Sequence, residues 1–234
     1  MDTDRDDHRG IRYMAAPSPI DHNKLITAAA KEALSPLGLK RHGKSRIWYD
    51  DHGWWCIVVE FQPSAWSSGT YLNVGVSWLL FGKAHWSFDV GYREKGFSPA
   101  KANQQFSEAL SEIVRQASQC IQDYRQRFGT IQQAHGYYQT VELRSHWEYY
   151  HAGVIAALAG DVSSACKDLE ALLALPRDHQ WQQGLYYRAL DLSRLLDNRR
   201  QFLDSVTGIV HRTRSQLLLD DRATEKLGLS NDGV

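Results

Sequence analysis

The sequence has few cysteines and no long apolar run. Its three cysteines, Cys56, Cys120 and Cys166, are far apart and form no CxxC pair. This spacing excludes a disulfide framework or a zinc knuckle and predicts reduced, mostly buried thiols. The longest apolar stretches are far shorter than the roughly 20 residues of a membrane span. Residues 1–19 are acidic and lack the apolar core of a secretory signal, so we expect a cytoplasmic protein that makes no membrane contact.

The sequence also lacks a net charge. Lysine plus arginine and aspartate plus glutamate each total 27. A balanced chain has no overall attraction for nucleic acids, and its weak colloidal repulsion favours self-association. Residues 39–50, "LKRHGKSRIWYD", interleave basic and aromatic side chains, a pattern that suits single-stranded nucleic acid. Because this run is short, we favour a solvated hairpin edge whose basic residues discourage strand addition, and we expect no nucleic-acid partner.

No catalytic or metal-binding motif is present. The 10 histidines show neither HxH nor HExxH spacing, and the chain has no glycine-rich phosphate loop and no GxSxG elbow. His146 and His151 would lie about 140° apart on a helix, which is poorly suited to sharing an ion. We therefore expect no metal and no cofactor, and the missing motifs make an enzyme less expected than a binding protein.

Tryptophan, in contrast, is abundant: the chain has 8, and four of them lie between Trp54 and Trp78. This region alternates apolar and polar residues in short runs that are separated by turn-rich connections. Connections of hairpin length cannot cross over to a parallel neighbour, so the pattern predicts an antiparallel meander. The four predicted strands are Arg46–Asp50, Trp54–Gln62, Tyr71–Leu80 and His85–Gly91.

Two helical patterns flank these strands. Asp21 is placed to cap a helix from about His22 to Ser35. Ser98-Pro99 predicts the start of a long amphipathic helix that ends at Gly129, with an apolar stripe wide enough to cover one face of the meander. Helix, meander and helix predict an α+β domain over residues 20–129, preceded by a disordered arm over residues 1–19.

Helical patterns alone follow, with a weak internal repeat of helix, turn and helix. The first copy resembles a tetratricopeptide repeat: Gly153, Gly160-Asp161 and Ala165 fall where that motif places a small contact, a turn and a core residue. The second copy departs from the motif, with Leu190 in place of the small residue. We predict a pair of helical hairpins over residues 145–219, docked on the first domain, and a tail over residues 220–234.

The alternation also predicts the register of the second and third strands. Apolar residues oppose apolar residues only if Trp55 lies by Trp78, and Glu60 then lies by Asn73. We expect Trp86 on the fourth strand to join the row of Trp55 and Trp78, so the tryptophans are mainly core. The opposite sheet face is then polar and gathers Glu60, Gln62, Tyr71, Asn73, Ser77, Ser87 and Asp89.

Two candidate sites lie on this polar face and its loop. Glu60 and Asp89 are two carboxylates, and if their environments differ one can act as a general acid and the other as a general base. A solvated sheet face also often carries such residues without any catalytic role. The loop "PSAWSSG" at 63–69 carries an aromatic side chain and hydroxyls suited to a ligand, although its Trp can equally fold back over the sheet edge. The candidate ligand-binding residues are Gln62, Trp66, Ser68, Tyr71 and Asn73.

The stretch from Leu34 to Trp78 resembles the bacterial family called domain of unknown function 4304. The resemblance extends over residues 22–128 and implies a helix, a first strand and a hairpin, with Gln62, Trp66 and Asn73 in a shared hairpin design. That family has no assigned activity to carry over. The matching positions are Leu37-Gly38, Lys40-Arg41, Gly43, Trp48-Tyr49, Glu60-Phe61-Gln62, Trp66-Ser67, Gly69, Tyr71 and Asn73-Val74-Gly75-Val76.

Two functional hypotheses follow. The favoured one is a non-catalytic binding or protein-interaction module that uses the Trp66 loop and the polar sheet face to hold a protein partner or a second copy of itself. The competing one is a hydrolase-type enzyme that uses Glu60 and Asp89. An open cleft on the polar face favours the enzyme, whereas a face covered by residues 145–219 gives both carboxylates a structural role.

Overall fold

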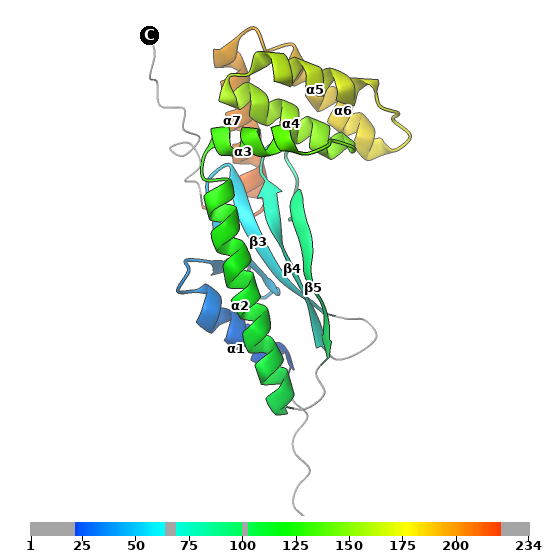
Figure 1. Cartoon of the computed structure of the whole chain (residues 1–234). Helices are drawn as coiled ribbons and strands as arrows, with labels where there is room; N and C mark the ends of the chain where they lie inside the picture. Colours follow the sequence, from blue (N-terminus) through cyan, green and yellow to red (C-terminus); the bar gives the residue numbers. More distant parts are fainter. Residues whose placement is uncertain (1–21, 64–68, 100–102, 221–234) are drawn as a thin grey trace, which may run out of the picture.

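The computed structural model describes residues 22–63, 69–99 and 103–220, which form an α+β fold (Figure 1). The predicted α+β class with an antiparallel sheet is confirmed. Within the described residues the sheet has five strands in the order β1-β2-β3-β4-β5, each antiparallel to its neighbour. The elements are α1 (His22–Leu34), β1 (Lys40–Arg41), β2 (Ile47–Asp51), β3 (Trp55–Pro63), β4 (Gly69–Trp78), β5 (Val90–Pro99), α2 (Asn103–Arg127), α3 (Ile131–Thr140), α4 (His146–Ala159), α5 (Val162–Ala174), α6 (Gln180–Ser193) and α7 (Arg199–Gln216).

The predicted register of the central hairpin is confirmed. Trp55 lies opposite Trp78, and Glu60 lies opposite Asn73. A slip by one residue would turn every apolar side chain of β3 to the other face, so burial of one face fixes the pairing.

The prediction of four strands is wrong in two places. Lys40–Arg41 adds a short strand, β1, which places the basic segment at the sheet edge. The strand predicted at His85–Gly91 runs instead over Val90–Pro99. Ser98-Pro99 therefore ends an edge strand, where proline is tolerated, and the long helix begins later, at Asn103.

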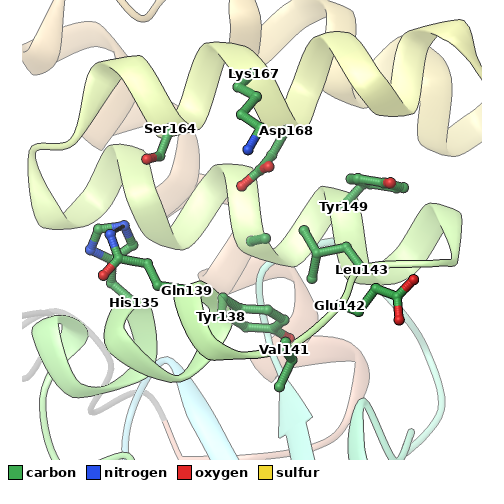
Figure 2. Close-up of a pocket in the computed structure, with 11 residues that line it drawn as sticks. His135, Tyr138, Gln139, Val141, Glu142, Leu143, Tyr149, Ser164, Lys167 and Asp168 are labelled. Atoms are coloured by element: carbon green, nitrogen blue, oxygen red, sulfur yellow. Dashed lines mark hydrogen bonds between the residues drawn. The ribbon is translucent and has the colours of Figure 1, made fainter.

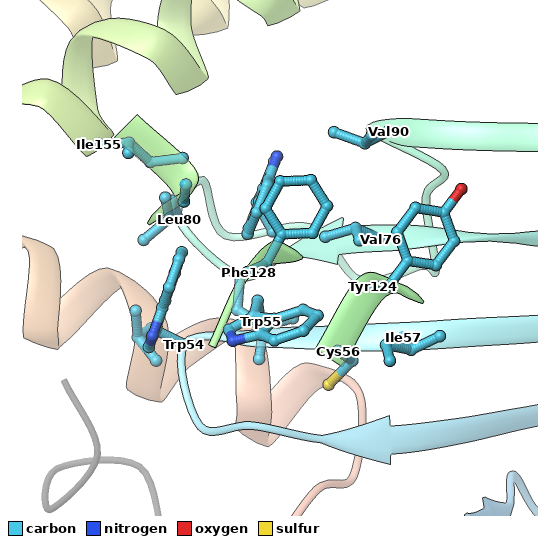
Figure 3. Close-up of a cluster of buried hydrophobic side chains, with 14 of the residues drawn as sticks. Trp54, Trp55, Cys56, Ile57, Val76, Leu80, Val90, Tyr124, Phe128 and Ile155 are labelled. Carbon is cyan, nitrogen blue, oxygen red and sulfur yellow. The ribbon is translucent and has the colours of Figure 1, made fainter. Parts of the chain in front are cut away.

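Trp86 lies outside the predicted tryptophan row. It precedes β5 and stacks on Tyr49, with ring centroids 5.2 Å apart and planes inclined by 27°. The row itself is extended by Trp54, whose ring is stacked 5.2 Å from that of Trp78. Phe128, which directly follows α2 and lies in this buried cluster (Figure 3), meets the Trp78 ring edge-on with ring centroids 5.3 Å apart. Aromatic packing of this kind contributes beyond simple area burial, so this cluster is the centre of the core.

Helices α1 and α2 lie along one face of the sheet, whereas α3 to α6 lie beyond the end of the sheet where β4 finishes (Figure 1). Hydrogen bonds join the parts: Trp78 Nε1 donates to Tyr138 Oη at 2.9 Å, and Tyr150 Oη donates to the Leu80 carbonyl at 2.8 Å. On α7, the buried Arg214 donates to both carboxylate oxygens of Asp51. The helical segment therefore caps the end of the sheet.

Helix α4 is the centre of the helical segment, because its residues Tyr150 to Leu158 are all buried. It meets α5 through a left-handed Gly160 and the N-cap Asp161, as the repeat pattern predicts. Gly153 faces Leu169 so closely that an added Cβ would lie 2.8 Å from Leu169 Cγ. Helix α3 precedes these hairpins in a stretch that the sequence analysis assigned no element. No helix among the described residues has the length and hydropathy to cross a membrane.

Candidate functional site

Four of the predicted ligand-binding and catalytic residues come together on the polar sheet face. Glu60, Gln62, Tyr71 and Asn73 lie on β3 and β4, and Arg93 of β5 joins them; we call these five residues the polar cluster. Trp66 and Ser68 lie outside the described residues. The cluster exists because the confirmed register places Glu60 opposite Asn73 and Gln62 opposite Tyr71.

Asn73 is the buried member of the polar cluster and hydrogen-bonds to two of the other members. Its side chain is fully buried, and its Nδ2 donates to Glu60 Oε2 at 2.8 Å and to Gln62 Oε1 at 3.1 Å. Its Oδ1 is also buried and has no hydrogen-bond partner in the described part of the chain. A buried acceptor without a hydrogen-bond partner lowers the free energy of unfolding by about 1–3 kcal/mol. The Asn73 side chain therefore lowers stability while it holds the side chains of Glu60 and Gln62 in place.

Arg93 forms the outer layer of the cluster. Its guanidinium carbon lies 4.1 Å from the centroid of the Tyr71 ring and 5.3 Å from that of Tyr92. Its Nη2 also donates to Gln62 Oε1 at 2.8 Å, although Arg93 itself is exposed. Arg93 was not among the predicted site residues, because the fourth strand was expected at His85–Gly91; the pairing of Asn73 with Arg93 follows only from the observed β5.

Asp89 lies in a different environment. Its Oδ1 is 2.7 Å from Lys83 Nζ, and its Oδ2 accepts from the Trp78 backbone N–H at 2.8 Å and from Ser87 Oγ at 2.9 Å. His151 Nε2 of α4 is 3.5 Å from Oδ1. These residues form a buried polar site at the end of the sheet, where the helical segment docks.

Burial and neighbouring charges shift two pKa values in this site. Burial raises the pKa of Asp89, but His151, when it is protonated, and Lys83 outweigh burial and hold that pKa well below its usual range. Burial lowers the pKa of His151, and Asp89 offsets only part of that effect. Both ring nitrogens of His151 are buried without a hydrogen-bond partner among the described residues, which favours the neutral imidazole. The site therefore holds a charged pair, Lys83 and Asp89, beside a neutral histidine.

Glu60 and Asp89 do not meet. Glu60 lies by Asn73, whereas Asp89 lies by Ser77, whose Oγ is 3.0 Å from that of Ser87. Asn73 and Ser77 are four positions apart along β4, a distance of about 13 Å. The hydrogen-bond partners of the two carboxylates are also separate. Their geometry gives no support to an acid–base pair.

The segment from Phe81 to Asp89 covers the end of the polar face near Asp89. Trp86 stacks on Tyr49, and Phe88 lies so close to Gly75 that an added Cβ would be 3.0 Å from Phe88 Cδ1. Residues 145–219, which were expected as a possible cover, contribute only at Asp89 itself, where His151 Nε2 of α4 is 3.5 Å from Oδ1. Glu60 and Gln62, at the other end, are partly exposed, and Arg93 is exposed. The accessible part of the polar face is therefore the polar cluster.

No protein-family model, no curated protein and no solved structure matches this chain. Among the described residues, no group of three or more His, Cys, Asp and Glu side chains is arranged to hold a metal ion.

Proposed function

We propose that this protein is a non-catalytic binding protein that holds a protein partner through the polar cluster. The observation that carries the proposal is the exposed Arg93, fixed over Tyr71 by stacking and by its hydrogen bond to Gln62. Arginine and tyrosine are enriched among the residues that dominate binding energy at protein interfaces. Because these side chains are ordered before binding, they lose less conformational entropy when a partner docks on them.

The place of Arg93 in the sheet supports this use. β5 is the edge strand of the described sheet, so a partner can approach Tyr92 and Arg93 from the open side. Tyr92 is 47% exposed, so part of its ring is accessible to a partner. The guanidinium has five N–H donors, and its planar fork suits a carboxylate on the partner. We propose a partner surface that offers an acidic group beside apolar area, on another protein or on a second copy of this chain.

The competing hydrolase hypothesis has no comparable support, because Glu60 and Asp89 have separate partners and Asp89 is buried with Lys83. We also propose that residues 22–128 are related to domain of unknown function 4304 and that the protein is cytoplasmic. Neither assigns a chemical reaction to the polar cluster.

Cross-linking and quantitative mass spectrometry test the proposal. Tagged wild-type protein and the variants Arg93→Glu and Tyr71→Ala are captured from cells of the source organism, with Arg200→Glu as the control. Arg200 is exposed at the first turn of α7, where a glutamate suits the helix dipole. We expect one set of proteins, or the chain itself, to fall at least tenfold with both cluster variants and to persist with the control. Equal recovery with all four proteins would remove the polar cluster as the binding surface.

A further inference from the structure

A pocket of about 480 Å³ lies between α3, α4 and α5, away from the polar cluster (Figure 2). Its floor is α4, which contributes Tyr149 and Ala152, and its walls come from α3 and α5. Sites for small ligands have volumes of roughly 300–1,000 Å³, so this pocket can enclose a small molecule or a single side chain.

The Asp168 carboxylate points into this pocket (Figure 2). It makes no hydrogen bond and no ion pair with any other described residue. Burial raises the pKa of Asp168, and Lys167 and His135 offset only part of that effect. A carboxylate accepts hydrogen bonds through two oxygens, so Asp168 lacks the donors that a half-buried charge normally has.

The cationic groups nearby do not supply those donors. His135 Nε2 is 3.4 Å from Asp161 Oδ2 and 3.3 Å from Gln139 Nε2, so that nitrogen is already engaged. Lys167 also lines the pocket, and its charge lowers the pKa of Asp168, but the two side chains form no ion pair among the described residues. Asp168 is therefore an acceptor to which no described side chain donates.

The other side of the pocket carries apolar side chains together with Glu142, whose carboxylate is paired with Arg144. Val141 and Leu143, which follow α3, and the partly buried ring of Tyr149 line it (Figure 2). Such a surface suits an aliphatic stem, and a tyrosine ring attracts a neighbouring cation through its π face. A ligand that fits both sides has a hydrogen-bond-donating cation at one end and a short hydrocarbon chain behind it.

We propose that this pocket binds a primary ammonium group on an alkyl stem, with Asp168 as the residue that accepts its N–H bonds. This chemistry occurs in free alkylamines and in the side chain of a lysine presented by a protein. The site is independent of the polar cluster, so failure of either proposal leaves the other standing.

The test is a set of NMR titrations of the full chain, uniformly labelled with ¹⁵N, near neutral pH. The probes are n-pentylamine, Nα-acetyl-lysine amide and n-pentanol, the last being an uncharged analogue of the first. We expect saturable binding of at least one amine, at least tenfold tighter than that of n-pentanol. Tighter binding of the lysine amide points to a protein lysine as the natural ligand, and tighter binding of n-pentylamine points to a free amine.

Asp168→Asn is the decisive variant, and Asp191→Asn on the exposed side of α6 is its matched control. We expect Asp168→Asn to weaken amine binding at least tenfold, to leave n-pentanol binding unchanged and to melt no lower than wild type, because it removes a partly desolvated charge. Asp191→Asn should bind the amines as wild type does. The proposal is overturned if no amine binds, if n-pentanol binds as tightly as n-pentylamine, or if Asp168→Asn retains full amine affinity.

Discussion

The ammonium group of Lys83 lies 2.7 Å from Asp89 Oδ1, and both side chains are 6% exposed. This pair fastens the segment from Phe81 to Asp89 onto the end of β4, because Asp89 also accepts from the Trp78 backbone. Lys83 Nζ lies 4.7 Å from the centroid of the Trp147 ring on α4, so the same charge contacts the helical segment. The pair thus connects the sheet to the helices.

Removing one member of this pair should be costly. We expect Asp89→Asn to lower the free energy of unfolding by about 3–5 kcal/mol, because the Lys83 ammonium is left buried without a counter-charge. Urea denaturation followed by circular dichroism measures this change. The double variant Lys83→Met/Asp89→Leu should recover much of the loss, since it leaves no unpaired charge. A loss below about 1 kcal/mol for Asp89→Asn would mean that water reaches the pair.

The buried His151 predicts a fall of stability in mild acid. Its folded pKa is below the ordinary value of 6.5, so the unfolded chain binds the proton more readily. The resulting destabilisation is absent well above pH 6.5 and grows as the pH falls through that value. The lowered pKa of Asp89 acts only at lower pH, because the stability that it contributes persists down to its ordinary value of 3.8.

Urea denaturation at several values between about pH 8 and about pH 5 tests this prediction. We expect the wild-type free energy of unfolding to fall across this range and the slope to be smaller in His151→Leu. The comparison concerns slopes, so a lower overall stability of the variant does not affect it. Identical slopes would show that His151 takes up its proton in the folded protein as readily as in the unfolded chain.

Gly153 offers a test of the contact between α4 and α5. An alanine Cβ there would lie 2.8 Å from Leu169 Cγ and 3.3 Å from the Leu169 backbone nitrogen, so the helices must move apart. We expect Gly153→Ala to destabilise by about 1–3 kcal/mol. Gly184→Ala is the control, because its Cβ would meet nothing within 4 Å, and it should stabilise by about 0.4–1 kcal/mol. Thermal melts of both variants measure these changes. An unchanged melting temperature for Gly153→Ala would contradict this packing.

The central hairpin was predictable because one of its faces is buried. Apolar alternation in β3 and β4 has a single register that keeps Trp55 with Trp78, and that register also places Glu60 by Asn73. Four members of the polar cluster followed from the same argument.

β5 was not predictable from alternation. Its exposed residues Tyr92 and Arg93 belong to an edge strand with little burial, whereas Trp86 and Phe88 alternate like a strand but pack over the sheet without pairing in it. Alternation indicates burial, and here burial and strand pairing occur in different segments. Arg93 was missed for this reason.

Helix α3 had a usable signal that was overlooked. Thr130 caps it, and its buried residues Ile131, Ala134 and Tyr138 are three and four positions apart. The pocket around Asp168 had no such signal, because it forms only where α3, α4 and α5 meet in space.

The central claim is that Arg93 dominates the binding of a partner. The most direct measurement is calorimetric titration of the captured partner, or the dimer dissociation constant if the partner is a second copy, for wild type, Arg93→Ala and Arg200→Ala. We predict that Arg93→Ala weakens binding at least tenfold, about 1.4 kcal/mol, while Arg200→Ala matches wild type. Equal affinity of all three proteins would contradict the claim.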